Sequence, residues 1–130
     1  HLSLRRQRQM CIRDRTMTVQ REPMHAGEFL LSEGTGNISR EAINVAAGPA
    51  LEPGQILGLV TATGQFAPYN PTAEDGSENA QAILYGPLGE SDVVRRGRAV
   101  VRLAEVSEAC LTGFDLAAEK ALASHFVIVR

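Results

Sequence analysis

Glycine and proline interrupt this chain so often that no long helix or strand fits between them. Pro53 presets the first central φ of a type II turn and Gly54 accepts the positive second φ, so this pair predicts a tight turn. The runs between such signals are short and apolar, and they predict a mostly β (α+β) domain of short strands and tight bends. Further turn signals stand at Gly48-Pro49, Gly64 and Asp75-Gly76.

Several of these runs carry strand patterns. Ile43 and Val45 fall on one face of an extended chain, which predicts a half-buried strand. In residues 97–106, Val101 and Leu103 fall on one face and the arginine between them on the other, which predicts one continuous strand. Other strands are expected in residues 28–34, 55–63 and 80–89.

The C-terminal part of the chain has a different pattern. Asp115 can cap a helix, and the LAAEKALA sequence that follows consists mainly of strong helix formers. Phe114, Ala118 and Leu122 recur four residues apart and form one apolar stripe. Residues 126–130, FVIVR, are rich in β-branched side chains and predict a final strand after this short helix.

Residues 5–15, RRQRQMCIRDR, hold five of the 13 Lys and Arg residues of the chain. This peptide resembles the translation of a transposase-based sequencing-library adapter. We therefore expect residues 1–16 to be a non-native leader, with Met17 as the start, and exclude them from fold reasoning. Without the leader, 8 basic residues remain against 14 acidic ones, a net charge of −6. An acidic body with 5% aromatic residues disfavours nucleic acid as a direct partner.

Residues that could carry chemistry do not gather at catalytic or metal-binding spacings. His25 and His125 have no nearby ligand partner in sequence, and the acids within residues 74–78 do not match a calcium loop. With the leader set aside, Cys110 is the single cysteine, which predicts a small buried hydrophobic side chain and no internal disulfide. Basic residues 95–98, RRGR, are expected at a solvated hairpin tip. We therefore predict no catalytic residue, no metal, no cofactor and no enzymatic activity.

The order of these elements resembles the head decoration proteins of tailed bacteriophages, of the lambda protein D type. The best-matched positions are Pro53-Gly54 with Leu57-Gly58, Asp75-Gly76 followed by residues 82–84, and the closing helix with its aliphatic strand. The resemblance implies a β-clip type fold with bent β ribbons over residues 28–130. It also implies a homotrimer on the outer surface of the virion capsid, made in the bacterial host cytoplasm. Its partner would be the major capsid protein, with no membrane involved.

The family also carries an N-terminal arm that orders against the capsid protein by adding to a strand. The polar residues 17–27 correspond to this arm by location and are expected to be flexible in the free protein. The resemblance implies that trimers join the head after it expands and stabilise it against packaged DNA. The candidate capsid-binding residues are Thr18, Val19, Gln20, Arg21, Glu22 and Pro23.

Two other functions remain open at this stage. Trimeric deoxyuridine triphosphatases also use β-clip folds, but their characteristic Asp, Tyr and Gly motifs are not found in this sequence. A small ligand-binding module of the antifreeze-like kind would suit LEPGQILG, residues 51–58, although such modules usually accompany a larger catalytic domain. A nucleotide-hydrolysis assay and the neighbouring genes would separate these readings, because a shared fold does not establish a shared function.

Overall fold

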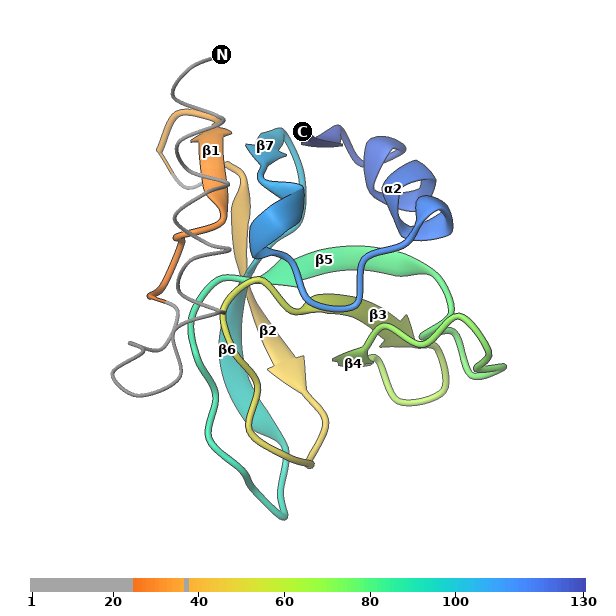
Figure 1. Cartoon of the computed structure of the whole chain (residues 1–130). Coiled ribbons are helices and arrows are strands. Elements are labelled where there is room, and N and C mark those ends of the chain that lie inside the picture. Colours follow the sequence, from red (N-terminus) through yellow and green to blue (C-terminus); the bar gives the residue numbers. More distant parts are fainter. Residues whose placement is uncertain (1–24, 37) are drawn as a thin grey trace, which may run out of the picture.

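A closed β-barrel and a small β-sheet make up most of the molecule. The structure is a computed structural model that describes residues 25–36 and 38–130 (Figure 1). The barrel has the strand order β2-β4-β3-β5-β6 and the sheet has the order β1-β7-β8. The barrel strands are β2 (Arg40–Val45), β3 (Ile56–Val60), β4 (Gln65–Pro68), β5 (Ala80–Leu84) and β6 (Arg95–Val100). The remaining elements are β1 (Leu30–Glu33), β7 (Ala104–Val106), the 3-10 helix η1 (Glu108–Cys110), α2 (Leu116–Ala123) and β8 (Val127–Val129).

The barrel strands pair antiparallel except at one seam, where β2 runs parallel to β4. Ile43 and Val45 of β2 are buried inside it while Asn44 is exposed, which confirms the predicted half-buried strand. Their packing partners include Leu57 of β3 and Leu84 of β5. The alternating pattern of β2 therefore supplies one wall of this core.

The small sheet and α2 enclose a second core above the barrel in Figure 1. In this sheet β1 runs antiparallel to β7, and β7 runs parallel to the final strand β8. Ala118 and Leu122 of α2 are fully buried in the second core, and Phe114 packs against it. The predicted helical stripe and closing strand are thus confirmed, and the described part of the chain is mostly β with one short α-helix.

The predicted single strand over residues 97–106 is wrong, because the structure divides it between two sheets. The strand β6 ends at Val100 in the barrel and β7 begins at Ala104 in the small sheet. Leu103 between them has a positive φ of 53°, which reverses the chain direction. The sequence does not predict this bend, because it contains no glycine there. Val101, which follows β6, packs against the barrel core as the continuous strand pattern would require.

The basic residues 95–98 lie within β6 and not at a hairpin tip, so that expectation is also wrong. Arg95 is only 8% exposed. Its guanidinium donates to the carbonyl oxygens of Ala46, Pro49 and Gly89, at 2.7 Å for Pro49. These hydrogen bonds to backbone carbonyl oxygens make burial of the charged side chain possible. The sequence does not show them, because every residue has a backbone carbonyl.

The turn at Pro53-Gly54 is confirmed, and the glycine is required there for two reasons. Gly54 has a φ of +93°, and a Cβ at this position would lie 2.3 Å from the carbonyl oxygen of Cys110. Cys110 itself is fully buried, as expected. It is not a free thiol, which contradicts the expectation of no disulfide.

Candidate functional site: the anchor of the N-terminal segment

The chain enters the described part of the fold through a fixed turn at Gly27. The backbone N–H of Gly27 donates to the carbonyl oxygen of Tyr85 at 2.9 Å, and Leu30 N–H donates back to Gly27 O at 2.9 Å. Gly27 has a φ of +71°, and a Cβ there would lie 2.8 Å from ring carbon Cε1 of Tyr85. The close approach of the tyrosine ring and the left-handed backbone both require glycine at this position.

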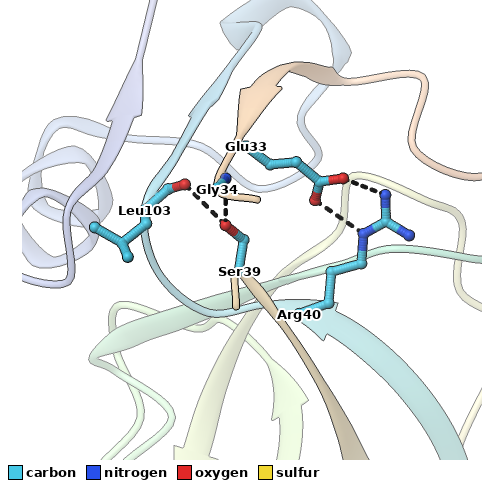
Figure 2. A network of polar contacts seen from close by, with 5 residues as sticks. All are labelled: Glu33, Gly34, Ser39, Arg40 and Leu103. Atoms are coloured by element: carbon cyan, nitrogen blue, oxygen red, sulfur yellow. Dashed lines mark hydrogen bonds and ion pairs between the residues drawn. The ribbon is translucent and has the colours of Figure 1, made fainter. Parts of the chain in front are cut away.

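Arg40 lies over the ring of the same tyrosine. Its guanidinium carbon lies 4.1 Å from the centroid of the Tyr85 ring, within the range of a cation–π interaction. The same guanidinium binds Glu33 at two points: Nε donates to Oε2 at 2.9 Å, and Nη2 pairs with Oε1 (Figure 2). The hydrogen bond to Glu33 raises the pKa of Arg40, because it favours the charged guanidinium. Strands β1 and β2 are thereby joined to the segment after β5.

Ser39 joins a third segment to this junction. Its side chain is fully buried, and Oγ accepts from the N–H of Gly34 at 2.8 Å. The same hydroxyl donates to the carbonyl oxygen of Leu103 at 2.9 Å (Figure 2). One hydroxyl therefore connects the end of β1, the start of β2 and the bend between β6 and β7, which are the places where the small sheet meets the barrel.

This junction, formed by Gly27, Glu33, Ser39, Arg40 and Tyr85, is named the anchor below. Every polar side chain in it has a partner, so the anchor is suited to fixing the direction of the preceding segment. Among residues 25–36 and 38–130, no three His, Cys, Asp or Glu side chains gather as a potential metal site. No helix within these residues is long and apolar enough to cross a membrane.

Comparison with known protein families shows to which family this chain belongs. A family model of the bacteriophage lambda head decoration protein D matches residues 19–127. The chain belongs to this family. The match extends over the barrel, α2 and strands β1 and β7 of the small sheet, ends at the first residue of β8, and reaches into the candidate arm. No curated protein matches the chain.

Membership makes this decoration protein a structural component of a phage capsid. It confirms the resemblance drawn from the turn glycines and the closing helix and strand. It also favours capsid decoration over the nucleotide-hydrolysing and antifreeze-like alternatives, since neither belongs to this family.

The predicted capsid-binding residues are not placed by the structure. They all lie outside the described residues, as do the leader over residues 1–16 and most of the arm over 17–27. These assignments therefore stay predictions. The six capsid-binding candidates are Thr18, Val19, Gln20, Arg21, Glu22 and Pro23.

Sequence reasoning missed the anchor because its members are scattered along the chain. Arg40 and Glu33 are seven residues apart on different strands, and Tyr85 follows a third strand. The one local signal was Gly27, a glycine at the junction of a polar segment and an apolar run. That glycine precedes the strand expected in residues 28–34, but nothing nearby indicated a tyrosine ring against it.

Proposed function

We propose that this decoration protein binds the outer surface of the expanded phage head as a homotrimer of β-clip type subunits. In that position it stabilises the shell against the pressure of packaged DNA. The observation that carries the proposal is the family match over residues 19–127, which begins inside the candidate arm and includes all of the described body except its last three residues. Its partner is the major capsid protein.

Capsid contact is assigned to the arm, with Thr18 to Pro23 as its central residues. A polar segment that orders on binding can add as a strand to an exposed sheet edge of the capsid protein. Ordering costs free energy, which lowers the affinity of each arm. The anchor supports this role because it fixes the point and direction from which the arm leaves the body.

Three arms on one trimer compensate for weak single contacts. Once one arm is bound, the others bind intramolecularly, at an effective concentration set by the reach of the arm. A ligand that binds only the expanded lattice stabilises that lattice by mass action. The shell therefore resists internal pressure better when it is fully decorated.

The test uses purified expanded heads that lack decoration. The full chain and a variant without residues 17–24 are added over a range of concentrations, and bound copies are counted after sedimentation of the heads. We expect saturable binding of the full chain and at least a tenfold loss of affinity for the deletion, which leaves the turn at Gly27 intact. A variant with residues 17–24 replaced by Gly and Ser controls for length. Equal occupancy by the deletion would refute the arm assignment, and no binding of the full chain would refute decoration itself.

A further inference from the structure

The barrel strand β6 presents two arginines on its outer side. Arg96 and Arg98 are both exposed, and they lie two residues apart, so their side chains stand on the same side of the strand. Gly97 between them faces the barrel core, because a Cβ at this position would lie 3.3 Å from the side chain of Leu88. Arg96 and Arg98 are named the arginine face.

The neighbouring strand β2 leaves the arginine face open. Ala42 is paired with Arg98 and Asn44 with Arg96, and both of these small residues are exposed. The amide oxygen of Asn44 accepts from Arg96 Nη1 at 3.4 Å, which is long for a hydrogen bond. The side chain of Arg98 has no hydrogen bond or ion pair in the described part of the chain. Both guanidiniums can therefore receive an acceptor from outside the molecule.

The arginine face is the exception in an acidic body. Residues 25–130 contain 13 acidic and 7 basic residues, so carboxylates are in excess. Two like charges about 7 Å apart on one strand repel each other and do not stabilise the fold. The remaining arginines of the described ranges are all engaged: Arg95 with carbonyl oxygens, Arg40 with Glu33, Arg102 with Glu41 and Arg130 with Glu105.

The arm leaves the body on the same side of this strand pair. Arg40 of the anchor lies two residues before Ala42 in β2, so its side chain stands on the outer side as well. Arg40 lies over the ring of Tyr85, and the backbone N–H of Tyr85 donates to the carbonyl oxygen of Arg98 at 2.9 Å. Gly27 in turn donates to Tyr85 O at 2.9 Å. The turn that leads into the arm is therefore next to the arginine face.

We infer that the arginine face binds an acidic patch on the outer surface of the major capsid protein, beside the place where the arm binds. Pro23, the last candidate contact residue, is four residues from Gly27, and a chain of this length spans at most about 14 Å. An arm bound through residues 18–23 thus holds the arginine face close to the capsid surface. Opposite charges at such a contact steer the approach of the two proteins and fix their orientation. This inference rests on the proposed function and adds the chemistry of the capsid surface.

Charge reversal in the full chain tests this contact on purified expanded heads. The double variant Arg96→Glu/Arg98→Glu is compared with Lys120→Glu/Arg130→Glu, which changes the net charge equally at two exposed cations outside the arginine face. Bound copies are counted after sedimentation of the heads, and thermal unfolding monitors folding of each variant. At about 0.1 M salt we expect at least a tenfold loss of affinity for the first variant and less than a threefold loss for the control. The difference should shrink at about 1 M salt, because the screening length falls from about 10 Å to about 3 Å.

The milder variant Arg96→Gln/Arg98→Gln removes the positive charges without adding negative ones, and it should lose less affinity than the reversal. Equal binding by the reversal and its control would overturn the inference but leave decoration and the arm assignment intact. A loss that does not depend on salt would also overturn it. A reversal that lowers the mass of the assembly in solution without heads would assign the arginine face to contact between copies instead. A full chain that does not bind heads would refute the proposed function itself.

Discussion

The hydroxyl of Tyr69 donates a hydrogen bond to the carboxylate of Asp115 at 3.0 Å, across 46 residues of sequence. The same carboxylate accepts from the N–H of Ala118 at 2.7 Å and so caps α2. One side chain thus begins the helix and attaches it to the segment after β4. This relationship sets how α2 covers the second core, because the tyrosine is itself buried there.

Replacing Asp115 should destabilise the fold more than replacing Tyr69 with Phe. Asp115→Ala removes both the cap and the acceptor for the tyrosine, with an expected loss of about 2–3 kcal/mol in the free energy of unfolding. Tyr69→Phe removes only one hydrogen bond and should cost about 1 kcal/mol. Urea denaturation of both single variants and the double variant measures their coupling. Simple additivity of the two losses would show that the bond contributes nothing.

Alkaline pH should destabilise the protein partly through Tyr69. Burial, and secondly the hydrogen bond to Asp115, raise the pKa of Tyr69 above its ordinary value of 10.0. The unfolded chain therefore loses the phenolic proton at lower pH than the folded chain does. The contribution of this group to stability is therefore fully present below pH 10 and is lost as pH rises through the folded pKa. Denaturant midpoints from pH 8 to 12 should fall less steeply in Tyr69→Phe than in the unchanged chain; identical slopes would contradict the assignment.

Two buried serines should respond in opposite ways to the same substitution. Ser39 Oγ makes two hydrogen bonds, whereas Ser107 Oγ is buried with no hydrogen-bond partner among the described residues. Ser39→Ala removes both hydrogen bonds, but Gly34 N–H still donates to Leu103 O at 3.0 Å, so no backbone group is left unpaired and the cost should be about 1 kcal/mol. Ser107→Ala removes an uncompensated buried hydroxyl and should be neutral or stabilising by up to about 1 kcal/mol. Thermal melting of the two variants provides the comparison, and a large loss from Ser107→Ala would reveal a partner for its hydroxyl.

The sequence was informative wherever structure depends on near neighbours. The turn at Pro53-Gly54, the cap at Asp115 and the stripe through Leu122 each follow from residues within one or two turns of chain. The bend at Leu103 was missed because tertiary pairing of β7 imposes a positive φ on a residue that does not favour it.

Long-range contacts account for the rest of what was missed. The sequence shows Arg95 as one of a basic run, but three carbonyl oxygens from two loops make it a buried structural residue. The anchor likewise brings Arg40 to Tyr85 across two strands. Neither set of contacts produces a periodic or local pattern in the sequence, so only the folded structure reveals it.

The geometry at Gly27 should affect capsid binding as well as stability. Gly27 and Gly36 both have positive φ, at 71° and 66°, but only Gly27 has a side chain within reach of an added Cβ. Gly36→Ala therefore measures backbone strain alone, about 1–2 kcal/mol, whereas Gly27→Ala adds a clash with the ring of Tyr85. Since relief of that clash would displace the turn that leads into the arm, Gly27→Ala should bind expanded heads more weakly than Gly36→Ala. Counting bound copies for both variants, at a temperature where each is folded, tests this. Equal binding would show that the anchor stabilises the fold without directing the arm.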